Sequence, residues 1–291
     1  MSVELPMPLS GPPGPPSDAP PGKACGSCAV FNVANLEKLG VHTASSDFVV
    51  ALAGNPNTGK STVFNALTGL RQHVGNWPGT TVARAEGAFR HRGAAFKVVD
   101  LPGTYSLLSN SSDEQAACDF LLFGDPDVTV VVVDATRLER NLNLVLQILQ
   151  ITERVVIALN LMDEAERHGI TLDTRHLSRE LGVPVVPMSA RKGVGVAELI
   201  EAIGQVAHGR PALKARATQK FAPAVERAVR SLAVQLSAEF PGLGNSRWVA
   251  LRLLEGDPNT ERAVRDGSLG DLERQHTARQ RALTAVERSA S

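Results

Sequence analysis

A surplus of charge of either sign is missing from this chain, whose 291 residues hold 30 Lys and Arg against 30 Asp and Glu. No broad basic field is therefore available to recruit nucleic acid. Only three cysteines occur, which excludes a disulfide scaffold and fits a reducing cytoplasm. Long apolar runs are also absent: stretches such as Val128–Val133 fall far short of the roughly 20 residues of a membrane helix. With no signal-peptide pattern at its start, the chain is expected to be soluble as given.

Proline is unevenly spread, since residues 1–24 hold eight of the 18 prolines. We expect residues 1–46 to form a disordered Pro/Gly-rich tail. This tail carries Cys25 and Cys28 in a C-x-x-C pair. Two thiolates at that spacing can bind a soft metal or cycle as a disulfide, but a full metal site needs about four ligands and there is no second pair. A structurally passive tail is the alternative.

The 43% hydrophobic content suffices for one α/β domain and a small second one. Residues 47–208 alternate short β-rich runs with helical segments, which predicts an α/β fold: a mostly parallel sheet flanked by helices. The apolar spacing predicts amphipathic helices at Leu138–Ile151 and Asp173–Leu181, the second capped by Asp173. The strand pattern then stops, and residues 209–291 are predicted to form an all-α domain. Its expected helices are Ala222–Phe240, Arg247–Leu254 and Asp271–Ser289.

A glycine-rich loop follows the apolar run that starts at Phe48, and it reads G-x-x-x-x-G-K-S between a predicted strand and a predicted helix. Backbone N–H groups in such a loop wrap phosphates, the lysine reaches the terminal phosphates, and the serine binds Mg²⁺. A nucleoside triphosphate is therefore the expected ligand, and the fold class narrows to a P-loop GTPase fold once the motifs below are added. The predicted nucleotide-binding residues here are Gly54, Asn55, Pro56, Asn57, Thr58, Gly59, Lys60, Ser61 and Thr62.

A D-x-x-G motif ends the next strand-like run, with Asp100 and Gly103 as its invariant positions. The aspartate can hold Mg²⁺ through a water, and the glycine N–H can contact a γ-phosphate. Between the two motifs, Gly79 precedes Thr80 and Thr81, and a threonine there can close over Mg²⁺ and the γ-phosphate. Thr81 is our choice, with Thr80 as the alternative.

Guanine selection is predicted from Asn160-Leu161-Met162-Asp163, which follows a strand-like run. The carboxylate of Asp163 can accept hydrogen bonds from the N1–H and the exocyclic amine of guanine, a donor pair that adenine lacks. The predicted base-site residues are Asn160, Met162, Asp163, Ser189 and Ala190. The predicted catalytic residues are Lys60, Thr81 and Gly103, and the predicted Mg²⁺ ligands are Ser61, Thr81 and Asp100.

With the motifs placed, the chain resembles the cytoplasmic N-terminal region of ferrous iron transport protein B (FeoB) over roughly residues 47–257. The phosphate loop is common to many proteins, whereas the segments with Asn76-Trp77-Pro78-Gly79 and with Leu253-Leu254-Glu255-Gly256-Asp257 are specific. The other matching stretches are Asp100–Leu107, Val133–Leu142 and Ala158–Asp163.

The resemblance implies a G domain, a helical domain that slows GDP release, and a membrane domain that moves Fe²⁺ inward, on the same polypeptide or on a separate subunit. It implies K⁺-stimulated GTP hydrolysis, with K⁺ held in part by Asn57; a turn-forming role is the alternative for this residue. It places the chain at the cytoplasmic face of the inner membrane. Candidate further partners are small cytoplasmic iron-transport accessory proteins and other copies of the chain.

Two positions depart from the wider GTPase pattern. Leu161 stands where many G proteins have a lysine that braces the phosphate loop, and Thr104 stands where a catalytic glutamine is usual. We therefore expect fast exchange and slow hydrolysis that depends on positioning and electrostatics. The alternative functions are a free-standing GTPase of the ribosome-assembly or RNA-modification type and a non-hydrolysing GTP-dependent scaffold. The role of Trp77 stays open between an exposed aromatic and a packing residue.

Overall fold

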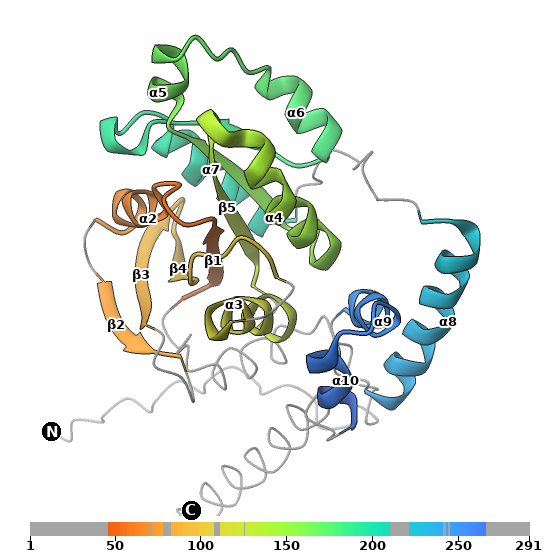
Figure 1. Cartoon of the computed structure of the whole chain (residues 1–291). Helices are drawn as coiled ribbons and strands as arrows, with labels where there is room; N and C mark the ends of the chain where they lie inside the picture. Colours follow the sequence, from red (N-terminus) through yellow and green to blue (C-terminus); the bar gives the residue numbers. More distant parts are fainter. Residues whose placement is uncertain are drawn as a thin grey trace, which may run out of the picture.

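The computed structural model of this chain describes residues 46–69, 72–77, 83–107, 111–124, 126–209, 221–240, 243 and 245–265. Within them, seven strands form one sheet in the order β2-β3-β4-β1-β5-β6-β7 (Figure 1). The pairs β1–β4, β1–β5, β5–β6 and β6–β7 are parallel, whereas β3 pairs antiparallel with β2 and β4. The strands are β1 Phe48–Gly54, β2 Gln72–Asn76, β3 Ala83–His91, β4 Ala94–Asp100, β5 Val128–Asp134, β6 Val155–Asn160 and β7 Val185–Pro187.

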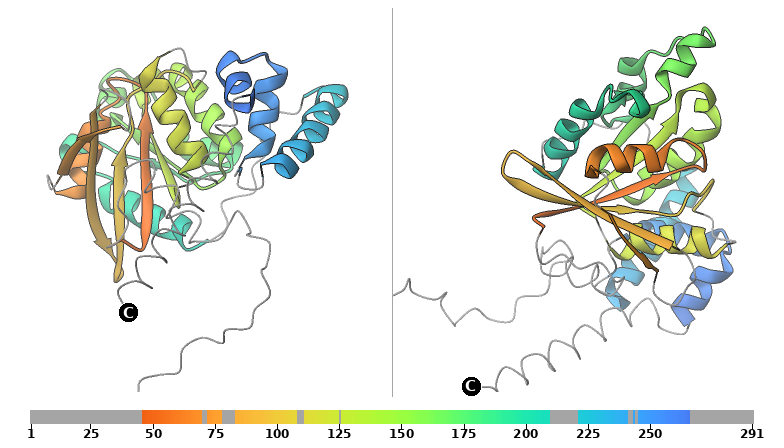
Figure 2. Two further views of the ribbon diagram at one scale, coloured as in Figure 1. Left: turned by 90° about the horizontal axis from the view of Figure 1, so that it is seen from below. Right: turned by 90° about the vertical axis from the view of Figure 1, so that its left-hand side faces the viewer.

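Helices cover both faces of the sheet, as Figure 2 shows. On one face lie α2 and α7, and on the other lie α3 and α4. Five further short or C-terminal helices, α5, α6 and α8–α10, complete the described part, together with the 3₁₀ turns η1 and η2. The helical elements are α2 Lys60–Thr68, α3 Ser112–Phe123, η1 Ala135–Arg137, α4 Leu138–Ile151, α5 Met162–Arg167, α6 Thr174–Leu181, η2 Ala190–Lys192, α7 Val196–Ala207, α8 Pro223–Glu239, α9 Ser246–Leu254 and α10 Pro258–Arg265.

The central strand β1 shows why the sheet is buried on both faces. Val49, Ala51 and Ala53 point into the core shared with α3 and α4, while Val50 and Leu52 point into the core shared with α2 and α7. Successive side chains of a strand point to opposite faces, so a continuous apolar run supplies both cores at once. The expected mostly parallel sheet with flanking helices is confirmed, as is the helix at Leu138–Ile151.

The cap predicted for the Asp173–Leu181 segment is also confirmed. The Asp173 carboxylate accepts a hydrogen bond from the His176 N–H at 2.9 Å, and the helix proper begins at Thr174. The edge strand β7 is short and runs only from Val185 to Pro187. Proline removes a ladder donor, so residues 184 and 187 restrict how far this edge strand pairs.

The helices α8–α10 pack beside α3 and α4, on the same side of the sheet (Figures 1 and 2). Asn245 joins the two parts: its side chain caps α9 by accepting from the Trp248 N–H at 3.0 Å, and it donates to the carbonyls of Gln150 at 3.2 Å and Ile151. Two carbonyls at the C-terminal end of α4 are thereby satisfied by a residue 94 and 95 positions further along the chain.

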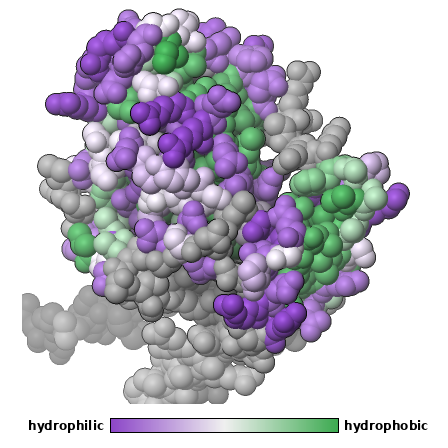
Figure 3. Space-filling model, viewed as in Figure 1, coloured by the Kyte–Doolittle hydropathy of each residue, from purple (hydrophilic) through white to green (hydrophobic). Residues whose placement is uncertain are grey.

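Trp77, left open by the sequence, is a packing residue with 3% of its surface exposed. Its ring meets Phe120 of α3 edge to face, with 5.4 Å between centroids, and the Arg84 guanidinium lies 5.4 Å from the ring centroid. Cys118, also in α3, is a buried free thiol, and burial raises its pKa far above the usual range. Some apolar side chains of α8 remain exposed, among them Val225 and Val234. Figure 3 shows hydrophobic surface over the region of α8.

No helix in the described ranges is both long and apolar enough to span a membrane. The predicted Asp271–Ser289 helix, the tail at 1–45 with Cys25 and Cys28, and the Gly79–Thr81 segment lie outside the residues that the structure describes.

Candidate nucleotide site

The phosphate loop connects the end of β1 to the start of α2, as its sequence predicts. Glycine is needed at both ends of the loop for reasons of space. A Cβ atom at Gly54 would lie 2.7 Å from the Val132 carbonyl oxygen, and one at Gly59 would lie 2.4 Å from the Asn160 Nδ2 atom. Gly59 also has a left-handed φ of +82°. Inside the loop, the Thr58 hydroxyl donates to the Asn55 carbonyl at 2.9 Å, which stabilises the turn.

Lys60 and Asp100 bring the first two motifs together. The Nζ atom of Lys60 lies 2.5 Å from Oδ1 of Asp100, and both side chains are mostly buried. Burial raises the pKa of the Asp100 carboxyl, and the Lys60 ammonium ion opposes this rise. Gly103 lies against the phosphate loop, because a Cβ atom there would be 3.4 Å from the Cα of Pro56. The ends of β1 and β4 thus place a cation, a carboxylate and a backbone N–H around the loop.

Ser61 and Thr62 are exposed in the first turn of α2. Their hydroxyl groups and the Asp100 carboxylate are hard oxygen donors, the ligand type that Mg²⁺ prefers. The first turn of this helix also directs the positive end of the helix dipole toward the loop. The donor set therefore fits a magnesium ion held jointly with phosphate oxygens.

Asn160 links the phosphate loop to the base side of the site. Its side chain is 1% exposed, donates to the Thr58 carbonyl at 3.0 Å and accepts from the Ala190 N–H at 3.0 Å. Thr58 lies in the loop after β1, Asn160 is the last residue of β6, and Ala190 is the first residue of η2, which follows β7. Since these parallel strands end at one edge of the sheet, the single amide of Asn160 can hold the phosphate loop and the segment after β7 in register.

Asp163, in the first turn of α5, lies beside Ser189. The Ser189 hydroxyl donates to Oδ1 of Asp163 at 3.0 Å and accepts from the Asp163 N–H at 3.2 Å. The Nζ atom of Lys192 lies 3.0 Å from Oδ2 of the same carboxylate. Hydrogen bonding to Lys192, the largest influence, lowers the pKa of Asp163 and keeps this carboxylate ionised. Met162 takes part through its backbone N–H, which donates to the Met188 carbonyl at 3.2 Å.

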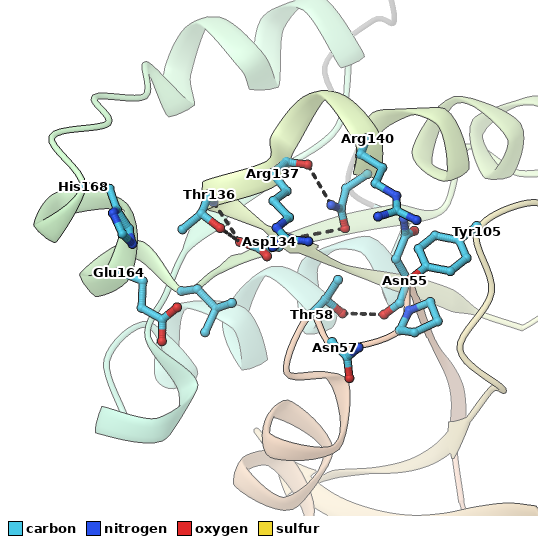
Figure 4. A pocket seen from close by; sticks show the side chains of 13 residues that line it. Asn55, Asn57, Thr58, Tyr105, Asp134, Thr136, Arg137, Arg140, Glu164 and His168 are labelled. Atoms are coloured by element: carbon cyan, nitrogen blue, oxygen red, sulfur yellow. Dashed lines mark hydrogen bonds between the residues drawn. The ribbon is translucent and has the colours of Figure 1, made fainter.

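A groove of about 370 Å³ lies beside the phosphate loop (Figure 4). Leu161, which has a left-handed φ of +63°, lines it together with Asn55 and Asn57. Beside Asn55 the Arg140 guanidinium stacks over the Tyr105 ring at 4.2 Å from the centroid (Figure 4). The sequence reasoning missed Arg140 and Lys192 because neither belongs to a nucleotide-binding motif.

The Thr104 hydroxyl forms hydrogen bonds within its own loop. The residue is 3% exposed, and its Oγ1 donates to the Ser106 carbonyl at 2.5 Å and accepts from the Ser106 N–H at 3.1 Å. This threonine hydroxyl closes a local turn. Slow hydrolysis without a glutamine-like residue at this position remains a prediction.

Two family models match the chain. The model of ferrous iron transport protein B covers residues 48–203, and the model of the FeoB cytosolic helical domain covers residues 221–290. The chain belongs to the FeoB family. The family model and the relatives below are those of a ferrous iron transporter and not of a ribosome-assembly GTPase.

Curated FeoB relatives include the Fe(2+) transporters of Salmonella typhimurium and of Escherichia coli K12. Each is 44% identical over 212 residues, which is 72% of this chain and 27% of the relative. The chain thus spans about a quarter of the length of these relatives.

Solved structures of FeoB fragments share the fold. The cytosolic domain of L. pneumophila FeoB has a TM-score of 0.67 at 38% identity, covering 77% of this chain and 88% of that one. The cytosolic domain of T. maritima FeoB in its GMPPNP form has a TM-score of 0.68 at 39% identity, covering 77% and 86%. The G domain followed by a helical domain is therefore the architecture of this chain.

Proposed function

We propose that the chain is a guanine-nucleotide switch that binds GTP and GDP, hydrolyses GTP slowly with Mg²⁺, and regulates Fe²⁺ transport across a membrane. The Asn160 bridge carries the proposal, because it joins the phosphate loop at Thr58 to the base-side loop at Ala190. A ligand with phosphates at one end and a purine at the other fits two loops held together in this way. The FeoB structures in GDP and GMPPNP forms support the same ligand class.

At the phosphate end, Lys60 is proposed to exchange Asp100 for the terminal phosphates when nucleotide enters. Asp100 and Ser61 then supply oxygen ligands for Mg²⁺, which neutralises charge on the phosphates. Gly103 offers its N–H to the γ-phosphate. Thr81 remains the proposed third magnesium ligand, with Thr80 as the alternative and Gly79 beside them.

At the base end, the two oxygens of Asp163 are proposed to accept the N1–H and exocyclic amine of guanine, and the Ala190 segment to face the guanine oxygen. Adenine lacks this pair of donors and cannot supply both hydrogen bonds to the carboxylate. Replacing Asp163 with Asn should shift preference from guanosine to xanthosine nucleotides. Calorimetric titration with GTP and XTP measures this shift, and GTP binding that the variant leaves unchanged removes Asp163 from the base site.

We propose further that Asn57 helps to hold K⁺ beside the phosphates, where the cation offsets charge that develops during hydrolysis. In other GTPases an arginine finger does this, with an effect of about 10³–10⁵ in rate. Asn57 has a left-handed φ of +67°, which also suits a turn-forming residue. Asn57→Gly separates the two roles, because glycine keeps the turn and removes the carboxamide.

Stimulation of the GTPase rate by KCl over NaCl is expected in the unmodified chain and is expected to be lost in Asn57→Gly, with GDP affinity retained. Equal rates in K⁺ and Na⁺ for the unmodified chain would end the cation role. Stimulation that survives in the glycine variant would assign Asn57 to the turn alone.

For the whole assembly, we propose a G domain at 47–208 and a helical regulatory domain at 209–291 that slows GDP release, both at the cytoplasmic face of the inner membrane. The proposed partner is an Fe²⁺-transporting membrane domain, on the same polypeptide or on a separate subunit, with small accessory proteins and further copies as candidates. The relatives named Fe(2+) transporters support this. Immunoblotting of fractionated cells tests it: a band far above 30.9 kDa in the membrane fraction is expected, and a soluble band near that mass would indicate a separate subunit or a free-standing GTPase.

A further inference from the structure

The carboxylate of Asp163 has a donor on each of its oxygens before any base is present. Oδ1 accepts from the Ser189 hydroxyl at 3.0 Å, and Oδ2 lies 3.0 Å from the Lys192 ammonium ion. The serine belongs to the predicted base-site motif, whereas the lysine comes from the end of η2, three residues beyond it. The fold therefore places the ammonium ion of Lys192 against the carboxylate of Asp163, the residue proposed to bind the base.

An ammonium ion and a guanine amine compete for the same lone pairs. Both are N–H donors, and both are strongest when the acceptor is ionised. The Asp163 side chain is 22% exposed, so few solvent-facing directions remain from which a second donor can approach. Lys192 is 59% exposed and sits on a flexible four-carbon stem, so it can swing into water at little cost.

We propose that Lys192 is an internal competitor for guanine, holding Asp163 in the empty site and leaving it when the base binds. This inference rests on the proposed function, in which Asp163 reads guanine. The lysine also ties the loop after β7 to α5 in the empty protein, together with the hydrogen bond from the Met162 N–H to the Met188 carbonyl. The base site is thus kept assembled without nucleotide while its affinity is reduced.

The consequence is the same for GDP and GTP, because both carry the same base. Lys192 lowers the affinity for each nucleotide by the same factor, and it favours release by returning to Asp163 as the base departs. An exposed ion pair of this kind corresponds to about a two- to five-fold change in affinity. Salt weakens the pair, so the effect shrinks as ionic strength rises.

Arg191 provides a matched control. It is the neighbouring exposed cation of η2, and no described residue forms an ion pair with it. Lys192→Met removes the ammonium ion and keeps a side chain of similar length, and Arg191→Met removes one positive charge from the same loop. A general electrostatic effect on a charged nucleotide would appear equally in both variants, whereas competition at Asp163 appears only in the first.

The experiment measures fluorescent GDP binding and release by stopped flow in the full chain at low and high salt. Lys192→Met is expected to bind GDP about two- to five-fold more tightly and release it more slowly at low salt, while Arg191→Met is unchanged or slightly weaker. The empty Lys192→Met protein should also melt at a slightly lower temperature, because the tie between its loops is lost. A structural role alone would lower both stability and affinity.

Unchanged or weaker GDP binding by Lys192→Met overturns the inference. ADP binding is measured beside GDP binding in the unmodified chain, so that a failure of the proposed function can be told apart from a failure of the competitor role. If the unmodified chain does not prefer GDP to ADP, the proposed function itself fails. If it prefers GDP and Lys192→Met binds no more tightly, only the competitor role is refuted.

Discussion

Adding a single methyl group at Gly59 should disrupt the part of the site that is proposed to bind the base, even though this glycine belongs to the phosphate loop. In Gly59→Ala, the new Cβ would stand 2.4 Å from the Asn160 Nδ2 atom, closer than a real carbon atom can remain. The Asn160 side chain must then shift. Because it is buried, with 1% of its surface exposed, the shift moves it away from both of its hydrogen-bond partners. The hydrogen bonds to the Thr58 carbonyl and from the Ala190 N–H are lost together.

The magnitude follows from two contributions. A non-glycine residue held at positive φ costs roughly 1–2 kcal/mol. Leaving a buried donor or acceptor unpaired costs roughly 1–3 kcal/mol for each group. Gly69 separates these contributions, because its φ of +63° is also left-handed while a Cβ atom there meets nothing within 4 Å. Gly69→Ala should therefore lower the free energy of unfolding by about 1–2 kcal/mol, and Gly59→Ala, which also loses two buried hydrogen bonds, by about 3–8 kcal/mol.

Equilibrium urea unfolding without nucleotide measures both values. The two tryptophans are buried, Trp77 at 3% and Trp248 at 5% exposure, so their fluorescence reports on the two parts of the chain. In an Asn160→Ala background the methyl of Gly59→Ala finds room, and the double variant should cost less than the sum of the single ones. Equal destabilisation by Gly59→Ala and Gly69→Ala, or full additivity with Asn160→Ala, would refute the clash as the cause.

Two further predictions concern α3 and α9. Burial raises the pKa of Asp119 to about 6, against a lowering by the Gln115 side chain that donates to it. Between about pH 4 and 6 the native state then holds a proton that the unfolded state has lost, so stability falls as pH rises through this window. Asp119→Asn should raise the free energy of unfolding at pH 7.5 by up to about 3 kcal/mol, with no gain near pH 4. Urea titrations at both pH values check this, and a constant difference would contradict it. Asn245→Ala removes the α9 cap and the bonds to the Gln150 and Ile151 carbonyls. It should cost about 1–2 kcal/mol and expose residues 221–265 to limited proteolysis while the sheet domain resists; uniform resistance would show that Asn245 does not hold the helical part in place.

Local patterns predicted much of the fold because their physical basis is local. The apolar spacing of Leu138–Ile151 defines one face of a helix, and it appears as α4 with the same bounds. The Asp173 cap needed only a carboxylate three residues before an amide. The strand ending at Pro187 was less predictable, since only three of its residues pair with the longer strand β6.

The tertiary structure alone decided the contacts that join distant segments. Trp77 could have been exposed or packed, and only the position of Phe120 in α3 determines that it is buried. Nothing in the sequence near Asn245 indicates that its amide reaches the end of α4.

The sequence by itself determined that this chain has a phosphate loop, an N-x-x-D motif after a later strand, and the family to which these belong, because each motif is defined by local spacing around a strand end. The tertiary structure decided that the Asn160 side chain donates a hydrogen bond to Thr58, 102 residues earlier, and that Lys192 forms an ion pair with Asp163. Such pairs arise where parallel strands end at one edge of the sheet, and which side chains meet there depends on the packing of the whole domain.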